Sequence, residues 1–142
     1  MTDILEFSGD NRWLSNFWPS PVWLDGLLFP NVEAAYVASK TTCVETRRIV
    51  QRLKTPSECK KFGRSIKLRD DWESVKIEVM RGLLRQKFTK PSVLAGRLIN
   101  TGNCQLIEGN YWGDTFWGVC RGTGENWLGK LLMEIRAEIQ NK

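Results

Sequence analysis

The sequence contains no histidine, and this absence limits the chemistry open to the protein. Histidine is the commonest general base and activates the nucleophiles of many hydrolases. Any catalysis must therefore rest on carboxylates, lysine, tyrosine or the backbone. The four cysteines, Cys43, Cys59, Cys104 and Cys120, are far apart and form no CxxC pair. We therefore expect free thiols in a reducing compartment, with no metal site and no cofactor.

Long apolar runs are also missing. No stretch approaches the roughly 20 apolar residues that span a membrane, and the first residues, MTDILEFSGDNRW, lack the layout of a signal peptide. We expect a cytoplasmic protein with no membrane association and no obligate protein partner. The 142 residues and 42% hydrophobic content fit a single domain over residues 1–142 with its own core. The net charge of +5 is mild and does not identify a partner.

Turn signals and apolar spacing predict an α+β fold, a single compact helix-rich domain with a small antiparallel sheet or hairpins. Residues 22–24 and 27–29 flank Asp25-Gly26, which predicts a hairpin with a type I′ turn. Short strands are also expected at residues 4–7 and 104–108. Helices are expected at residues 32–41, 45–53, 56–63, 72–88, 92–99 and from 126 onward. Strands and helices do not alternate, which excludes a parallel βαβ architecture.

The helix expected at residues 32–41 carries Glu33 and Lys40 in the segment PNVEAAYVASK. Glu33 falls in the first turn, where the helix dipole favours a carboxylate. Lys40 follows two turns later, so both side chains project from about the same face, with Tyr36 and Val37 between them. Taken alone, the pair is more typical of a helix-start acid and a solvated lysine than of a catalytic pair.

The densest candidate region is EGNYWGDTFWGVCRGTGENWLGK, which begins at Glu108. Tryptophan offers a flat surface, glycine lets the backbone approach a ligand, and carboxylates supply proton or charge chemistry. This pattern predicts either a pocket for a planar group or a tryptophan-rich core with acids at its turns. Its end fits the GxxxxGK of a P-loop, but Leu131 replaces the magnesium-binding Ser or Thr and Glu125 adds negative charge. We therefore reject a nucleoside-triphosphatase.

Two further segments have open interpretations. In SGDNRWLSNFWPSP, amide side chains among aromatic residues could contact a base or a sugar, or the loop could simply cap the core. In KKFGRS, Gly63 and Arg64 could hold a phosphate, although a basic helix end with a glycine stop is the more ordinary interpretation.

Together these segments resemble the NADAR family, which is named for NAD and ADP-ribose and includes riboflavin-pathway N-glycosidases. The resemblance rests on RWLSNFWPSP, FPNVEAAYVASK, KKFGRSIKLRDDWESVKIEVMRGLLRQKF and INTGNCQLIEGNYWGDTFWGVCRGTGENWLGKLLMEIR, in this order and spacing. The family usually has histidine directly after the helix-start glutamate and commonly in the GxNxLG segment, where this chain has Ala34 and Trp127. This chain works without those histidines or has shifted its substrate.

The resemblance implies an N-glycoside hydrolase, which cuts between a ribosyl carbon and the nitrogen of a nucleobase-like ring. One branch of the family acts on early phosphoribosylated riboflavin intermediates. Another removes ADP-ribose from guanine and reverses a toxin's modification of DNA. The expected substrate is thus a ribosylated base, or an ADP-ribosylated nucleotide or DNA. A non-catalytic ADP-ribose-binding module is the main alternative, and a nucleic-acid-binding domain is a weaker one.

The resemblance also implies roles for individual residues. Glu33 would activate water or stabilise positive charge at the anomeric carbon. Lys40 would either bind phosphate or attack the sugar to form a Schiff base, which requires a partly buried lysine with a lowered pKa. Asp114 would be a second acid that engages the sugar or protonates the leaving nitrogen. The residues expected to bind substrate are Asn16, Phe17, Tyr36, Arg64, Trp72, Glu108, Trp112, Trp117, Gly118 and Asn126.

Overall fold

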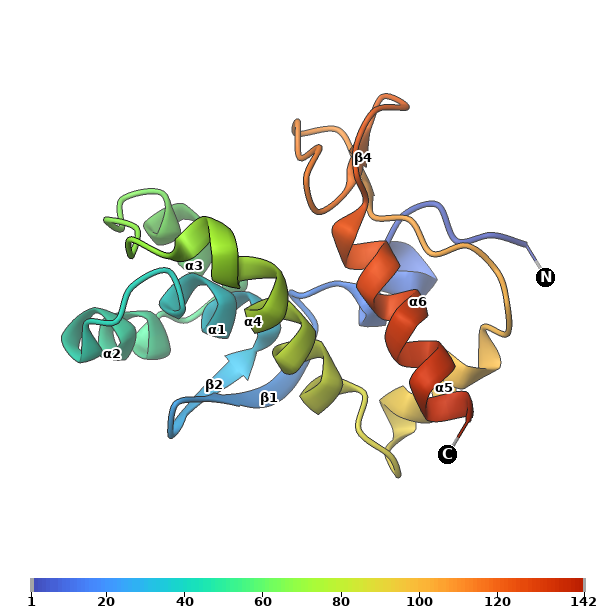
Figure 1. Cartoon of the computed structure of the whole chain (residues 1–142), viewed down its shortest axis with the longest axis horizontal. Helices are drawn as coiled ribbons and strands as arrows, with labels where there is room; N and C mark the ends of the chain where they lie inside the picture. Colours follow the sequence, from blue (N-terminus) through green and yellow to red (C-terminus); the bar gives the residue numbers. More distant parts are fainter. Residues whose placement is uncertain (1, 142) are drawn as a thin grey trace. The chain divides into compact units, whose positions relative to one another are not determined.

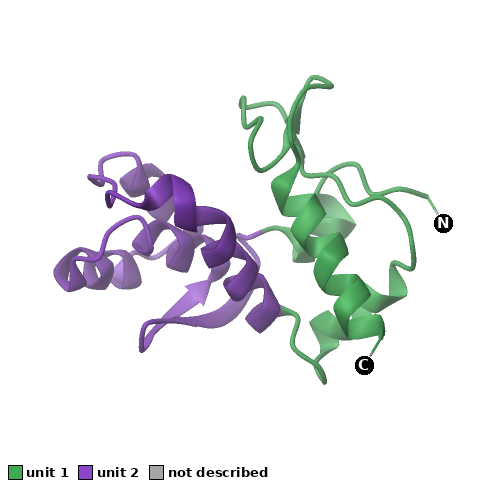
Figure 2. Cartoon of the chain, in the orientation of Figure 1, with its two compact units in different colours: residues 1–15, 88–142 green, residues 16–87 purple. Residues whose placement is uncertain are grey.

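The computed structural model describes residues 2–141, and the chain divides into two compact units, coloured separately in Figure 2. Unit 2 is Asn16–Lys87, and unit 1 combines Met1–Ser15 with Phe88–Lys142. The predicted class is confirmed, because helices dominate and the main sheet is a small antiparallel pair. Within residues 2–141, no helix combines the length and the apolar character needed to cross a membrane.

Unit 2 opens with a hairpin formed by β1 (Pro19–Leu24) and β2 (Leu27–Asn31). Asp25 and Gly26 join the strands with φ of 46° and 84°. A type I′ turn needs positive φ at both central residues, and Asp-Gly adopts it at little cost. Val22 and Phe29 are paired across the strands and fully buried. The predicted hairpin is therefore confirmed, with strands that extend further at their open end.

The helices of unit 2 surround α1 (Val32–Ala38), which packs against α2 (Val44–Arg52), α3 (Pro56–Gly63), α4 (Trp72–Lys87) and the hairpin (Figure 1). Five of the seven residues of α1 are buried, so this short helix is stabilised by packing rather than by its own hydrogen bonds. It ends three residues earlier than the sequence predicted. The residues Thr55-Pro56-Ser57-Glu58 have the pattern of a capping box, and Thr55 caps α3, since its hydroxyl accepts a 3.1 Å hydrogen bond from the Glu58 N–H.

Unit 1 contains the 3-10 helix η1 (Gly9–Leu14), α5 (Val93–Asn100), β3 (Gly109–Asn110), β4 (Val119–Cys120) and α6 (Trp127–Gln140). α5 packs against α6 over a core that includes Leu98, Leu131 and Ile135. The strands expected at residues 4–7 and 104–108 are wrong, because only one bridge, Ile4 to Leu106, forms between them. The alternation there reflects the buried side chain of Leu106 and not a strand ladder. β3 and β4 instead form a two-residue parallel pair.

Candidate functional site

The first turn of α1 fixes the position of Glu33 from two sides. The Glu33 N–H donates to the carbonyl of Asn16 at 3.1 Å, and the Ala34 N–H donates to the side chain of Asn31 at 2.8 Å. The first N–H groups of a helix have no partner within it, so these bonds set where the Glu33 side chain leaves the helix. Asn16 was expected to bind substrate through its side chain. Its Oδ1 is buried and has no hydrogen-bond partner within residues 2–141, so that role stays a prediction.

Lys40 lies just beyond α1, with its ammonium half-buried beside α3. A Cβ added at Gly63 would lie 3.4 Å from Lys40 Nζ and 3.2 Å from both methyl groups of Val37. The missing side chain at Gly63 therefore lets α3 approach closely enough to cover the lysine. Burial lowers the pKa of Lys40 from its ordinary 10.5, the Glu33 carboxylate opposes this change, and the Arg64 guanidinium adds to it. Partial desolvation, the change that a lysine nucleophile needs, is thus the leading cause of the lowered pKa.

Cys59 on α3 also responds to the charge of Glu33. Burial raises the pKa of this thiol, and the carboxylates of Glu33 and Glu58 raise it further. The thiol is 1% exposed, and it donates weakly to the Val50 carbonyl at 3.8 Å. A buried thiol that stays protonated is a poor nucleophile, so Cys59 is not a candidate for nucleophilic chemistry.

The aromatic residues of unit 2 include both buried and solvent-exposed rings. The rings of Tyr36 and Trp72 meet at 5.3 Å between centroids, with planes tilted by 52°. Trp72 is only 5% exposed, so it supports Tyr36 and offers little open ring face of its own. Phe17 is 37% exposed. α1 and the neighbouring ends of α3 and α4 thus gather five of the predicted residues, which are Glu33, Tyr36, Lys40, Arg64 and Trp72.

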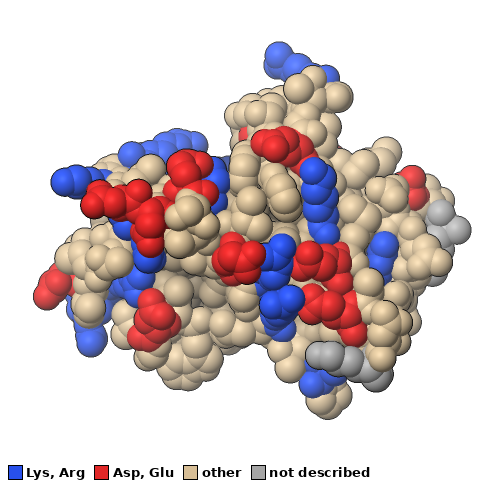
Figure 3. All heavy atoms as spheres, in the orientation of Figure 1, with Lys and Arg blue, Asp and Glu red and all other residues tan. Residues whose placement is uncertain are grey.

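A cavity of about 480 Å³ lies near the end of α1, lined by Thr41, Thr42 and the segment from Lys67 to Asp71. Its size suits a small ligand. Its lining mixes two hydroxyls with basic and acidic side chains, so its charge does not select an anion. The surface drawn in Figure 3 is similar, with Lys and Arg interspersed among Asp and Glu. Within residues 2–141, no three His, Cys, Asp or Glu side chains are grouped to hold a metal ion.

In unit 1, the loop between β3 and β4 fixes Asp114 firmly. Asp114 Oδ1 accepts hydrogen bonds from the N–H groups of Phe116 at 3.1 Å and Trp117 at 2.9 Å. Asn110 bonds the Asp114 backbone in both directions, donating to its carbonyl at 2.9 Å and accepting from its N–H at 3.1 Å. Sequence reasoning missed Asn110, although Asn110 with Gly113 three residues later is an ordinary turn signal. The catalytic role of Asp114 stays a prediction and would need its second oxygen.

Position 118 requires glycine because the neighbouring backbone leaves no room for a side chain. A Cβ there would collide with the carbonyl oxygen of Glu108 and would lie 2.8 Å from Asn110 Nδ2. The N–H of Val119 donates to the same Glu108 carbonyl at 2.9 Å, so two chain segments meet directly at this glycine. Glu108 is half-buried. Trp112, in contrast, is 52% exposed on the loop and packs edge-on against Tyr111.

Asn126 joins the loop to α6. It adopts a left-handed conformation with φ of 54°, accepts a 2.9 Å bond from the Glu108 N–H, and donates a 3.0 Å bond to the Leu106 carbonyl. The N–H groups of residues 125–128 donate to the carbonyls of residues 115–118. These donors are already bonded and cannot cradle a phosphate, which supports the rejection of a P-loop. The expected contact of Asn126 with a base or ribose stays a prediction.

Known proteins match both the sequence and the fold. N-glycosidase YbiA of Escherichia coli is 37% identical over 138 residues, which cover 93% of this chain and 84% of that protein. N-glycosidase Npun_R5314 of Nostoc punctiforme is 35% identical over 133 residues, covering 89% and 85%. Riboflavin biosynthesis protein VVA0006 of Vibrio vulnificus is 34% identical over 134 residues, which cover 92% of this chain but only 36% of that protein.

The solved structure of the E. coli protein YbiA, determined by NMR, matches with a TM-score of 0.85 at 35% identity. The match covers 99% of this chain and 88% of that one. The family model described as the NADAR domain matches residues 6–140. The resemblance found in the sequence motifs is thereby confirmed over almost the whole length, and the chain belongs to the NADAR family.

Proposed function

We propose that the protein is an N-glycosidase that hydrolyses the bond between a base nitrogen and the anomeric carbon of a phosphoribosyl or ADP-ribosyl group. The observation that carries this proposal is the half-buried Lys40, whose pKa burial lowers, two turns from Glu33. A lysine and a carboxylate can together act at an anomeric carbon without histidine. The relatives named N-glycosidase support the reaction class.

In the proposed reaction, the neutral amine of Lys40 attacks the anomeric carbon as the bond to the base nitrogen breaks. The electron pair of that bond stays on the base, which leaves after gaining a proton. The sugar ring then opens to a protonated imine, and the ring oxygen becomes a hydroxyl. Water adds to the imine carbon and expels the lysine as an amine. One water is consumed for each base and each ribosyl group released.

Glu33 has two tasks in this scheme. Its charge stabilises the positive charge that develops at the anomeric carbon, and its carboxylate takes a proton from the attacking water. Its charge already affects the pKa of both Lys40 and Cys59, which supports a place close to the reacting centre. The Arg64 guanidinium, near enough to lower the pKa of Lys40, is proposed to bind a phosphate group of the substrate.

The remaining predicted residues are proposed as substrate contacts. Asp114 would engage the sugar or protonate the leaving nitrogen through Oδ2, since Oδ1 holds two backbone N–H groups. Tyr36 is proposed to contact the planar ring, with Trp72 supporting it. Trp112 and Trp117 stay predicted substrate contacts. Asn16, through its buried Oδ1, would accept a hydrogen bond from the substrate. Phe17, Glu108, Gly118 and Asn126 are proposed to shape the surroundings of the substrate.

A turnover assay tests the proposal and chooses the substrate. Purified protein is incubated with DNA carrying ADP-ribosylated guanine and, separately, with an early phosphoribosylated riboflavin intermediate. Mass spectrometry then reads the free base and the sugar product. We expect base release from one of the two, and its loss in Glu33→Gln. Release of no base from either substrate, with wild-type protein that binds them, contradicts the proposal.

A non-catalytic ADP-ribose-binding module is the second candidate, and Trp127 favours it. This residue occupies a position where the family commonly has histidine. Its ring stacks on Phe116 at 6.4 Å between centroids, and Lys130 Nζ lies 4.9 Å from its centroid. The position thus serves packing rather than proton transfer. Calorimetric binding of ADP-ribose, with no base released over hours from the conjugates above, would establish this function instead.

A further inference from the structure

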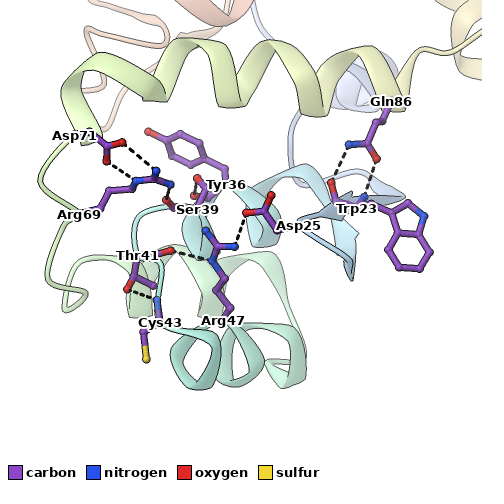
Figure 4. A network of polar contacts seen from close by, with 10 residues as sticks. All are labelled: Trp23, Asp25, Tyr36, Ser39, Thr41, Cys43, Arg47, Arg69, Asp71 and Gln86. Atoms are coloured by element: carbon purple, nitrogen blue, oxygen red, sulfur yellow. Dashed lines mark hydrogen bonds and ion pairs between the residues drawn. The ribbon is translucent and has the colours of Figure 1, made fainter.

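Arg69, in the segment before α4, holds the end of α1. Its backbone N–H donates to the carbonyl of Lys40 at 2.8 Å, and its Nη1 lies 3.5 Å from the carbonyl oxygen of Ser39. Its Nε and Nη2 donate to the two carboxylate oxygens of Asp71 at 2.6 and 3.1 Å. Figure 4 shows the guanidinium lying between Asp71 and Ser39. One residue thus binds two successive carbonyls just beyond the helix.

These two carbonyls lack partners within the helix. α1 has only seven residues, and no N–H group of a helix is placed to donate to its last carbonyls. The backbone beyond Ala38 is held by i to i−3 bonds, with Lys40 N–H to the Val37 carbonyl at 3.1 Å and Thr41 N–H to the Ala38 carbonyl at 3.4 Å. A cation at a helix C-terminus is also favoured by the helix dipole.

We infer that Arg69 is a positioning residue for Lys40, which fixes the last turn of α1 so that the lysine ammonium stays between the Tyr36 ring and Gly63. The consequence for catalysis rests on the proposed function, whereas the structural part does not. Arg69 acts through the backbone of Lys40 and through Ser39, and it is not assigned any contact with the substrate.

The charged and aromatic groups that act on the Lys40 ammonium come from α1 and from the end of α3. Glu33 and Tyr36 face it from α1, and Arg64 faces it from the end of α3, where Cys59 also couples to Glu33. Burial is the leading cause of the lowered Lys40 pKa. If the last turn loosens, the ammonium gains water, and its pKa must rise toward the ordinary 10.5.

Two substitutions separate the charge of Arg69 from its shape. Arg69→Gln removes the cation. Arg69→Lys keeps the positive charge but loses the planar guanidinium with its several N–H donors. An ammonium cannot bind both oxygens of Asp71 and still reach the Ser39 carbonyl. Arg52→Gln is the matched control, since it removes one arginine of the same unit from an exposed position at the end of α2.

The readout is the Lys40 pKa in the free protein, followed by NMR titration of the lysine side chains, with Lys40→Met assigning the signal. We expect Arg69→Gln to raise this pKa, Arg69→Lys to raise it less, and Arg52→Gln to leave it unchanged. The pH at which kcat/KM rises should move by the same amount. A folded Arg69→Gln variant with an unchanged Lys40 pKa overturns the inference. If Arg69→Gln does not fold, Arg69→Lys decides it by the same titration.

The titration tests the positioning role of Arg69, and the turnover assay tests the N-glycosidase, so either hypothesis can fail without the other. If wild-type protein releases no base but the Lys40 pKa moves on substitution of Arg69, the positioning role stands and the N-glycosidase does not. If base is released but the Lys40 pKa does not move, the N-glycosidase stands and the positioning role of Arg69 does not.

Discussion

The ammonium of Lys40 lies 5.7 Å from the centre of the Tyr36 ring, one helical turn earlier. An aromatic face attracts a cation, and the carboxylate of Glu33 favours the charged lysine as well. The pKa of Lys40 is nevertheless lowered, so burial outweighs the charge of Glu33. The protein therefore keeps a larger neutral fraction of this amine than an exposed lysine has, and each role assigned to it can be measured.

Substitution of Glu33 by Gln should reduce base release by about 10²–10⁴-fold, the range for losing a general acid or base. The backbone bond from the Glu33 N–H to the Asn16 carbonyl does not depend on the side chain, so the fold should persist. Single-turnover assays measure release, and calorimetry should show that substrate binding is largely kept. Glu45→Gln, on the exposed start of α2, is the control. Full turnover in Glu33→Gln would remove Glu33 from the mechanism.

The pH dependence of kcat/KM distinguishes the two roles of Lys40. A nucleophilic amine must be neutral, so kcat/KM should rise as pH increases through the lowered Lys40 pKa. An ammonium that only binds phosphate gives the opposite sign, because affinity falls as the charge is lost. Borohydride added during turnover should trap a covalent adduct on Lys40 only in the first case. Absence of any adduct, with a falling profile, would assign Lys40 to phosphate binding.

Lys40→Met should abolish base release yet stabilise the fold at neutral pH. A lowered folded pKa means that the unfolded chain binds more protons between the folded and unfolded values, so stability rises with pH in that window. The protonated lysine therefore destabilises the protein below its folded pKa. The Tm of Lys40→Met should exceed that of the wild type at pH 7, and the difference should shrink as pH approaches 10.5. A lower Tm at pH 7 would show that the contacts with Tyr36 and Glu33 dominate.

Asp114 can be tested without disturbing its loop. Asp114→Asn keeps an oxygen that can accept from the Phe116 and Trp117 N–H groups, but it loses the charge and the acidic proton. We expect the melting curve to change little and base release to fall by about 10²-fold or more. Asp114→Ala should in addition destabilise the loop by about 1–2 kcal/mol, as loss of a similar backbone cap does. Unchanged release in Asp114→Asn would leave Asp114 a purely structural role.

Two glycine substitutions should change stability in opposite directions. Gly118→Ala places a Cβ against the Glu108 carbonyl and should cost about 1–3 kcal/mol, typical of overpacking. Gly82→Ala lies within α4, where an added Cβ meets nothing within 4 Å, and it should gain about 0.5–1 kcal/mol from helix propensity. Urea unfolding monitored by tryptophan fluorescence measures both. A Gly118→Ala variant as stable as the wild type would show that the loop relaxes around residue 118.

Local signals explain most of what could be predicted. The Asp25-Gly26 turn and the Thr55 cap are encoded within four residues, and both have the expected form. Helical periodicity alone places Glu33, Tyr36 and Lys40 on one face. The strand expected at residues 104–108 fails because pairing depends on a distant partner, and the only β-bridge that this described segment forms joins Leu106 to Ile4.

The burial of Lys40 could not be predicted, because it depends on Gly63 in another helix. Nothing in the segment PNVEAAYVASK indicates that α3 covers this lysine, whereas the close approach at Gly63 shows it directly. The contacts of Arg69 were hidden for the same reason, since they join residues 29 and 30 positions apart. The sequence offered Asp70 or Asp71 as the cap of α4, and the Asp71 carboxylate accepts both of its side-chain hydrogen bonds from Arg69.

The glycines of residues 108–130 have a consequence for how this protein can change. Side chains at Gly109, Gly118, Gly124 and Gly129 would each run into a backbone carbonyl, of Leu5, Glu108, Gly118 and Leu106 respectively. A library randomised over this stretch should therefore return glycine at these four positions while exposed neighbours such as Tyr111 and Trp112 vary. New specificity would then arise by exchanging outward side chains on an unchanged backbone path.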